Sequence, residues 1–321
     1  MQKMSLKYSL ESILFEDEHH DNCSICGRHF INDETTHLGY DSNHKLVYVG
    51  NCCRNFIKST IVRHVYFPRD YTKPTKETIL WRYLNLSKFI TLLKDSSLFF
   101  SRADLFSDPF EGAKGIYTNE EKWDSFYKDF VKKAICNPPD GVKMPYNTES
   151  QIETEASRLL NDIKNFGKNS RTKTFINCWH ENQFESEAMW KLYCPDLSQG
   201  LAIKTTYGKL FNELNQKEHI EIGRVQYIDY TKQMLGINGA FWYKRKSFEH
   251  EKEVRAIIHR FHNTNDTLGI NITISLENLI SAIHISPMAP HWFVEMVKDV
   301  SRKYGLSKPI LQSQMTVKPF Y

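Results

Sequence analysis

The stretch LWRYLNLSKFITLLKDSSLFFSRA, residues 80–103, predicts a strand, a helix and a second strand in immediate succession. Apolar residues recur at helical spacing in its middle, so residues 86–95 are expected to form a helix. Residues 78–83 before this helix and SSLFFSRA after it (96–103) are rich in aromatic and apolar side chains and are expected to be strands. The unit therefore predicts an α+β fold built outward from two strands joined by one helix.

The rest of the chain continues this pattern without regular alternation. Further helices are predicted over 123–131, 152–163, 185–193 and 291–304, and further strands over 174–179, 200–205, 222–228, 269–276 and 280–285. Strands outnumber long helices, which favours an α+β fold with a mixed sheet and flanking helices. The sequence contains neither GxGxxG nor GxxxxGK[ST], so neither a Rossmann nor a P-loop nucleotide site is expected.

The composition limits the class of protein. The chain has 321 residues, of which 40% are hydrophobic, enough to bury a sizeable core. No run of 18 apolar residues and no signal peptide is recognisable, so we expect a cytoplasmic protein that makes no use of a membrane. Seven cysteines, an odd number, fit reduced thiols or metal ligands better than disulfides. The net charge of +4 is compatible with a nucleic-acid partner without requiring one.

A small metal-binding module is predicted near the start of the chain. The motif NCSICGRHF carries Cys23 and Cys26, and VYVGNCCRNF carries Cys52 and Cys53 after a short expected strand, 46–49. This order of knuckle, hairpin and helix start is that of a treble-clef zinc module, whose ion needs four ligands. Cys23, Cys26 and Cys52 are the first three. The candidates for the fourth are Cys53, His37, His44 and His29, with Cys53 and His37 ranked together.

We expect this zinc to be structural, because so small a module has little core of its own. The alternative is four thiols without a metal. Residues 67–78, with two prolines and scattered charges, form an expected linker. The predicted domains are therefore 1–72 and 73–321.

A second unusual stretch is SFEHEKEVRAII, residues 247–258. If it is a strand, Glu249, Glu251, Glu253 and Arg255 share one side, because side chains alternate with period two. Three neighbouring carboxylates would repel one another and raise at least one pKa, which suits proton transfer. The alternative is an ordinary solvated charged face.

Four islands of sequence resemble the bacterial family known as domain of unknown function 2971. They are LWRYLNLSKFITLLKDSSLFFSRADLFSDPFEG, CWHENQFESEAMWKLYC, GLAIKTTYGKL and KRKSFEHEKEVRAII, in this order. The resemblance covers about residues 78–285 and leaves the zinc module outside. Some members of that family are associated with phage defence, so the resemblance implies a defence role.

The first island is also similar to the entry motif of ADP-ribosyltransferases, notably the DNA-modifying toxin group. That resemblance implies an ADP-ribosyltransferase-like fold, NAD as cofactor, and a nucleic acid or a nucleic-acid-associated protein as target. By its pattern, Arg82 holds the NAD ribose and Glu253 is the late catalytic carboxylate, while His180 takes the middle position. The implied catalytic residues are Glu253, Arg82, Glu251 and His180, and the implied cofactor-binding residues are Arg82, Tyr83, Arg102, Phe100 and Trp190.

Other functions remain open at this point. In a metal-dependent nuclease or phosphoesterase, Asp104, Asp108, Glu111 and the late glutamates would hold a divalent ion. In a non-enzymatic binding or sensor protein, the zinc module would offer a docking surface. Tyr83, Phe100 and Trp190 could instead be core residues, and His180 a hydrogen-bonded structural histidine.

Overall fold

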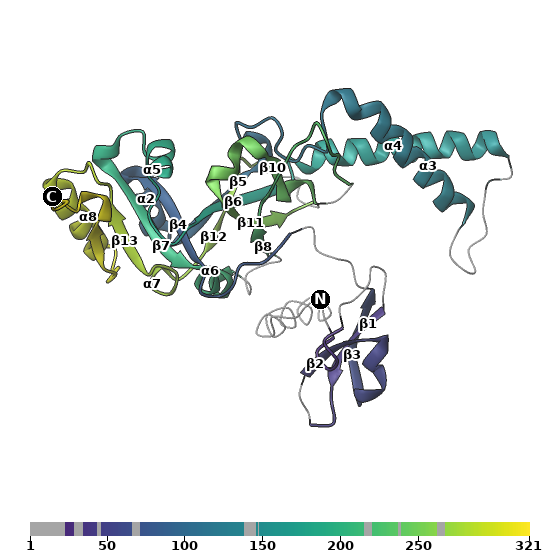
Figure 1. Cartoon of the computed structure of the whole chain (residues 1–321), viewed down its shortest axis with the longest axis horizontal. Helices are drawn as coiled ribbons and strands as arrows, with labels where there is room; N and C mark the ends of the chain where they lie inside the picture. The colour runs from purple at the N-terminus through teal and green to yellow at the C-terminus, as the bar shows by residue number, and fades with distance from the viewer. Residues whose placement is uncertain are drawn as a thin grey trace. The chain divides into compact units, whose positions relative to one another are not determined.

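The computed structural model of the protein describes residues 23–28, 35–43, 46–65, 71–137, 146, 148–214, 220–236, 239–261 and 267–321 (Figure 1). The chain divides into two compact units, residues 1–70 and 71–321. The sequence prediction placed the domain boundary near residue 72. Within the described ranges, no helix is both long and apolar enough to cross a bilayer.

The small unit contains a three-stranded antiparallel sheet. Its strands are β1 (Thr35–Tyr40), β2 (Leu46–Gly50) and β3 (Ser59–Val65), in the order β2-β1-β3. A 3-10 helix, η1 (Asn51–Phe56), follows β2 directly and carries two of the four cysteines. The expected strand over 46–49 is confirmed, and the expected helix after it is this short 3-10 segment.

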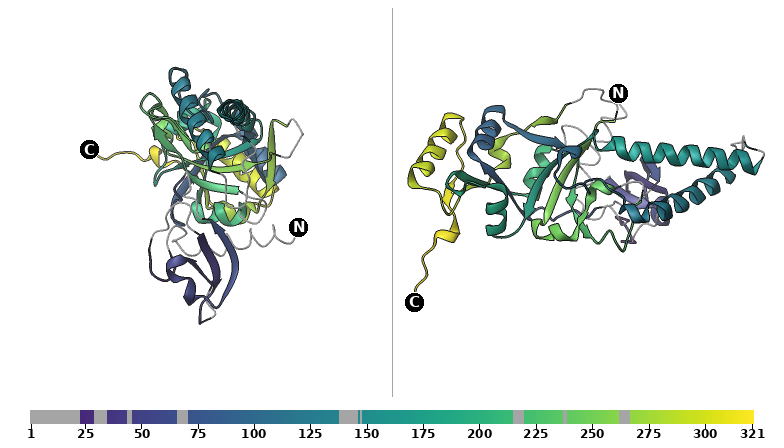
Figure 2. Two further views of the ribbon diagram at one scale, coloured as in Figure 1. Left: turned by 90° about the vertical axis from the view of Figure 1, so that its right-hand side faces the viewer. Right: turned by 90° about the horizontal axis from the view of Figure 1, so that it is seen from above.

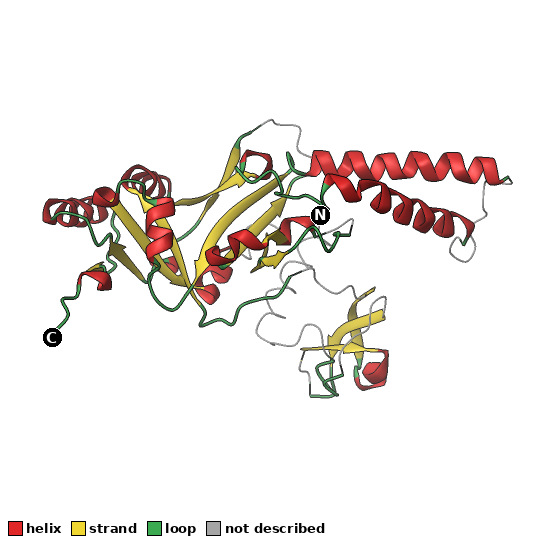
Figure 3. Cartoon of the chain, turned by 45° about the horizontal axis from the view of Figure 1, so that its top comes forward, coloured by secondary structure: helices red, strands yellow, loops and turns green. Residues whose placement is uncertain are grey.

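The large unit is built on one nine-stranded mixed sheet, drawn in yellow in Figure 3 with its helices in red. Its main path runs β12-β5-β6-β4-β7-β13-β14, and β11 joins β6 to β8. The strands are β4 (Ile79–Asn85), β5 (Ser97–Arg102), β6 (Thr174–Glu181), β7 (Gly200–Thr206), β8 (Ile220–Arg224), β11 (Glu253–His259), β12 (Gly269–Thr273), β13 (Ala282–Ile285) and β14 (Ile310–Gln312). A separate parallel pair joins β9 (Gln226–Ile228) and β10 (Tyr243–Arg245). The expectation of a mixed α+β sheet is confirmed.

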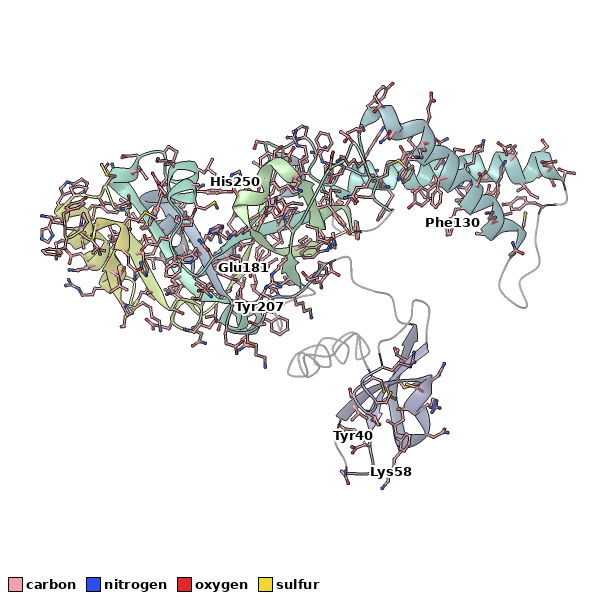
Figure 4. All side chains as sticks on the ribbon, viewed as in Figure 1. Tyr40, Lys58, Phe130, Glu181, Tyr207 and His250 are labelled. Atoms are coloured by element: carbon pink, nitrogen blue, oxygen red, sulfur yellow. The ribbon has the colours of Figure 1, made fainter. Side chains whose placement is uncertain are left out.

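Seven α-helices accompany this sheet in the described ranges: α2 (Leu86–Asp95), α3 (Glu120–Cys136), α4 (Glu149–Ser170), α5 (Glu187–Tyr193), α6 (Tyr207–Leu214), α7 (Leu276–Leu279) and α8 (His291–Lys303). Helices α3 and α4 lie side by side and project beyond the sheet as an arm (Figures 1 and 2). Exposed aromatic residues on this arm include Phe130, labelled in Figure 4. The sequence predicted both helices but too short, over 123–131 and 152–163.

The strand–helix–strand unit over residues 80–103 is confirmed. The Asn85 side chain caps α2 by accepting a hydrogen bond from the Lys88 backbone N–H at 3.0 Å. Helix α2 buries its apolar face through Phe89, Leu92 and Leu93. It ends at Ser96, whose φ of 43° is the left-handed conformation that stops a helix and turns the chain into β5.

The sheet splits between the two strands of this unit. Strand β11 pairs along the whole of one edge of β6, so β4 and β5 share the other edge. There, β5 pairs with Phe175 and Ile176, while β4 pairs with His180 and Glu181. On this edge no described strand pairs with residues 177–179. The Asn177 side chain donates to the Phe99 carbonyl at 2.8 Å and bridges part of the gap. The diverging strands open a space in the middle of the sheet.

Candidate functional site

A cavity of about 670 Å³ lies at this split. Its walls come from β4, α2, β5, the loop after β5, β6, α5 and the segment that leads into β11. This volume is within the range typical of small-molecule and cofactor pockets. Five of the predicted site residues line it: Arg82, Tyr83, His180, Glu251 and Glu253.

The segment before β11 corrects one expectation. Residues Lys246–Glu251 form a 3-10 helix, η6, and Lys252 has a left-handed φ of 39°, so the strand begins only at Glu253. The four charged residues therefore do not share one strand face. Glu249 is exposed, whereas Glu251 and Glu253 are buried and reach the cavity from two different elements. The alternation of charges looked like a strand because periodicity alone does not reveal where a left-handed residue breaks it.

A buried network of charges surrounds Glu253. Its Oε1 accepts a hydrogen bond from Arg255 Nε at 2.7 Å, and its Oε2 lies 3.3 Å from Lys244 Nζ. Arg255 Nη2 also donates to Glu111 Oε2 at 2.8 Å, and Lys244 pairs with Glu251. Arg255 and Glu111 have fully buried side chains. Counted by formal charge, the cluster has three carboxylates and two cations.

The pairing decides the protonation state of Glu253. Burial raises the pKa of its carboxyl group, but the charges of Arg255 and Lys244 outweigh burial and lower it to about 2. The raised pKa expected from three crowded glutamates is therefore wrong for Glu253, because the two cations lie closer than the sequence indicated. Burial does raise the pKa of Glu111, even beside Arg255. Glu253 is a permanent anion at physiological pH.

Arg82 is the opposite case, a half-buried cation without a counter-charge. Within the described part of the chain, no carboxylate pairs with its guanidinium and no group hydrogen-bonds to it. Its guanidinium carbon lies 5.7 Å from the centroid of the Trp179 ring. Burial lowers the pKa of Arg82 to about 10, which still leaves it charged at neutral pH. A desolvated, unpaired guanidinium in a cavity wall is suited to bind an anionic ligand group.

The side chains of Arg82 and Glu253 point to opposite faces of the sheet. Trp81 and Glu253 both stand directly opposite His180, on its two neighbouring strands, so these three side chains lie on one face. Arg82, the next residue, points to the other face. Both residues nevertheless line the same cavity, because it runs through the split between β4 and β5. A ligand that contacts both Arg82 and Glu253 must therefore pass through the gap between β4 and β5.

His180 offers an unused acceptor to the cavity. Its Nδ1 lies 2.6 Å from the Glu251 carbonyl oxygen and must donate to it, which leaves Nε2 unprotonated. Nε2 is buried and has no hydrogen-bond partner in the described chain. Burial lowers the pKa of His180, so the neutral form is favoured. Glu181, the next residue, ends β6 (labelled in Figure 4) and pairs instead with Arg224 at 2.6 Å.

Three predicted cofactor-binding residues lie outside the cavity. Phe100 is fully buried, and its neighbour Phe99, 48% exposed, lines the cavity in its place. Trp190 is 1% exposed and packs in a core cluster with Trp81 and Tyr83. Arg102 donates to Asp104 at 2.7 Å. The error for Phe100 is a single residue, since successive strand residues face opposite sides and the sequence FF does not say which faces the cavity.

Aromatic side chains form much of the cavity wall. They are Trp81, Tyr83, Phe99, Phe106, Trp179, Tyr193 and Phe248. Of these, Trp81, Phe99, Phe106, Tyr193 and Phe248 were not predicted from the sequence. Tyr193 is the last residue of α5 and lies on the same helix face as the buried Trp190, but it is 43% exposed. Such rings can stack on a planar heterocycle.

The acidic residues of the metal-dependent alternative are already occupied by arginines. Asp104 pairs with Arg102, Asp108 accepts from Arg245 Nη2 at 2.7 Å, and Glu111 forms two hydrogen bonds with Arg255. In the described ranges, the single group of side chains arranged to hold a metal is the cysteine cluster of the small unit. The geometry therefore gives no support to a divalent-ion site at these carboxylates.

The cysteine cluster consists of Cys23, Cys26, Cys52 and Cys53, whose sulfur atoms all lie within 4.8 Å of one another. The Cys26 and Cys52 sulfurs are 3.6 Å apart. Tetrahedral zinc with bonds of about 2.3 Å separates its sulfur ligands by about 3.8 Å. Gly27, at φ 70°, closes the knuckle by donating its N–H to the Cys23 carbonyl at 2.8 Å. Four thiols at this spacing could hold one zinc ion.

The geometry favours Cys53 over His37 as fourth ligand. Cys53 belongs to the cluster, whereas His37 Nε2 lies 3.3 Å from the Asn51 side-chain oxygen. The other candidates, His29 and His44, lie outside the described residues.

Two solved structures are similar to the chain. One is "Thermus sp. 2.9 DarT in complex with NAD+", 8% identical, with 77% of this chain and 100% of that chain covered and a TM-score of 0.35. The other is the same protein in complex with carba-NAD+, 10% identical, with 75% and 97% covered and a TM-score of 0.31. These similarities are too low to carry an argument about function. No family model and no curated protein matches the chain, so membership in the domain of unknown function 2971 family stays a prediction.

Proposed function

We propose that the large unit is an NAD-dependent ADP-ribosyltransferase whose active site is the cavity in the split sheet. The observation that carries the proposal is the charge arrangement: an unpaired guanidinium, Arg82, and a net-negative cluster around Glu253 line one cavity. NAD carries charges that complement both, since its diphosphate is anionic and its nicotinamide ring is cationic.

The diphosphate and the nicotinamide riboside of NAD would bind through different interactions. The diphosphate would supply the hydrogen-bond acceptors that Arg82 lacks, and a guanidinium suits phosphate oxygens because its donors form a planar fork. Lys88, on α2, lines the same cavity and would add a second positive charge. The nicotinamide riboside would lie toward Glu253, with exposed rings such as Phe99 and Tyr193 available for stacking on the bases.

The reaction breaks the bond between the ribose C1′ and the nicotinamide nitrogen. The bonding electron pair leaves with nicotinamide, which becomes neutral, and positive charge develops on the ribose. The acceptor then bonds to C1′ and loses a proton. A fixed anion near the ribose stabilises the developing charge electrostatically. Glu253 meets this requirement because it stays ionised, with a pKa of about 2.

Because of this low pKa, Glu253 is too weak a base to take up the proton that the acceptor loses. His180 is better suited, since it lines the cavity and its unprotonated Nε2 has no partner in the described chain. We assign His180 to accept a hydrogen bond or the proton from the attacking group. Glu251 holds Lys244 by an ion pair and His180 by its backbone carbonyl, so it is a positioning residue.

The wider biological role rests on the sequence resemblance alone. By that resemblance, we propose a bacterial defence or toxin effector whose target is nucleic acid or a nucleic-acid-associated protein. In the small unit, Cys23, Cys26, Cys52 and Cys53 would hold a structural zinc ion that stabilises their fold.

The test is label transfer from NAD carrying a labelled adenylate, with single-stranded DNA, duplex DNA, RNA and a cell protein extract as acceptors. The transfer rate of Glu253→Gln should be at least about 100-fold lower than that of the wild type. This is the typical effect of removing a group that stabilises charge in the transition state. Glu249→Gln, an exposed glutamate four residues earlier, is the matched control and should retain the rate. Assays at a temperature where both variants are folded separate chemistry from stability. Undiminished transfer by Glu253→Gln would refute the assignment.

A further inference from the structure

The loop Asp108–Gly112, with the sequence DPFEG, contributes to the cavity wall and contains a second buried polar atom without a hydrogen bond. Asp108 Oδ1 accepts hydrogen bonds from Arg245 Nη2 at 2.7 Å and from the Phe110 backbone N–H at 3.0 Å. Its other oxygen, Oδ2, is buried and has no partner in the described chain. The Asp108 side chain is 5% exposed and lines the cavity.

The loop holds Asp108 in a fixed position. The Glu111 N–H donates to the Asp108 carbonyl at 3.1 Å, and Gly112 follows at φ 72°. A Cβ on residue 112 would lie 2.6 Å from the Phe241 ring, so only glycine fits this close approach. The carboxylate is thus anchored by one oxygen and by its backbone, while the second oxygen stays without a hydrogen bond. Buried polar atoms are nearly always paired, and such an exception in a cavity wall calls for a ligand partner.

Shared contacts place Asp108 at the Glu253 end of the cavity. Lys244, which contacts Glu253, and Arg245, which contacts Asp108, both lie over the Phe248 ring, at 4.7 Å and 5.3 Å from its centroid. In the same way Glu111, three residues after Asp108, shares Arg255 with Glu253. Asp108 is therefore near the carboxylate that would stabilise the ribose, on the same side as the leaving group of the proposed reaction.

We propose that Asp108 is a specificity-determining residue whose Oδ2 accepts a hydrogen bond from the carboxamide N–H of nicotinamide. This inference rests on the proposed function and adds a residue to the site. The carboxamide has an N–H donor that matches a lone carboxylate oxygen. Nicotinic acid in the same place has a carboxylate, which offers no donor and repels Asp108. The site should therefore select NAD against nicotinic acid adenine dinucleotide.

The experiment measures the dissociation constants of both dinucleotides by calorimetry, for the full chain and for Asp108→Asn. Asparagine keeps Oδ1 for Arg245 and Phe110 but turns the free acceptor into an N–H donor. The wild type should bind NAD at least about tenfold more tightly than the acid, the factor expected for one hydrogen bond to a charged group. Asp108→Asn should bring this ratio to about one or reverse it. Asp104→Asn, whose carboxylate pairs with Arg102 outside the cavity wall, should keep the wild-type ratio.

Each result has a defined meaning. An altered ratio in Asp108→Asn alone supports the assignment, because a loss of folding would weaken both ligands equally. A wild type that binds NAD but binds the acid as tightly overturns the role of Asp108 and leaves the transferase proposal standing. If Asp108→Asn keeps the wild-type ratio of the two dissociation constants, the role of Asp108 is likewise overturned and the transferase proposal stands. A wild type that binds neither dinucleotide overturns both proposals.

Discussion

Glu253 and Arg255 stand two residues apart on β11 and point to the same face of the sheet, joined by a hydrogen bond of 2.7 Å between Glu253 Oε1 and Arg255 Nε. The pair is buried, and the other donors of Arg255 reach Glu111 and the Phe241 carbonyl. The carboxylate proposed for catalysis is thus held rigidly by charges within the protein. This arrangement fixes an anion in the cavity wall and removes its capacity to act as a base.

Arg82→Met should stabilise the protein while it abolishes NAD binding. The guanidinium is partly desolvated and has no counter-charge in the described chain, so its removal should raise the free energy of unfolding by about 1 kcal/mol, as is common where a site trades stability for function. Differential scanning fluorimetry with and without NAD measures both effects. Arg102→Met is the control: it breaks the pair with Asp104, so it should lower stability and keep NAD binding. A destabilised Arg82→Met would contradict our reading of Arg82 as unpaired.

Glu253→Gln should lose stability at neutral pH but not in acid. The folded pKa of about 2 lies below the ordinary value of 4.5, so the ionised carboxylate stabilises the fold above pH 4.5. That contribution, about 3 kcal/mol, disappears as the pH falls toward 2. Urea unfolding of both proteins between pH 7 and pH 2.5 should show the two free energies converging. A difference that stays constant with pH would argue against the ion-paired state of Glu253.

Phe99→Ala and Phe100→Ala should have opposite consequences. Phe100 is fully buried, so its truncation should cost about 3–5 kcal/mol of stability. Phe99 is 48% exposed in the cavity wall, so its truncation should cost much less but weaken NAD binding several-fold. Chemical denaturation and calorimetry measure the two quantities. Equal NAD affinities for wild type and Phe99→Ala would remove Phe99 from the site.

The small unit should contain one zinc ion per chain. Cys53→Ser should lower the zinc content and destabilise the unit, because the thiolate supplies one of four bonds. His37→Ala should keep the zinc, since its imidazole lies near Asn51 and outside the cluster. Elemental analysis of the purified variants decides between them. Loss of zinc from His37→Ala but not from Cys53→Ser would reverse the assignment.

Local elements could be predicted from the sequence because local physics specifies them. Helix α2 begins and ends where its cap and spacing indicate, and most strands of the large unit lie within a few residues of their predicted ranges. The cysteine cluster was predictable from the spacing of its ligands, which a tight turn brings together. The segment 249–255 was not, because a single left-handed residue, Lys252, ends the apparent alternation.

The sequence by itself determined the α+β class, the strand–helix–strand unit and the residues around which the candidate site is built, since these depend on periodicity, capping and residue type. Only the tertiary structure decided which face each strand residue occupies, that Arg82 and Glu253 reach one cavity through a split in the sheet, and which charges are paired. Pairing depends on residues distant in sequence: Glu111 and Arg255 are 144 positions apart yet form an ion pair, while Arg82 has no counter-charge in the described chain. Electrostatic energy falls with distance in space, and distance along the chain does not enter it.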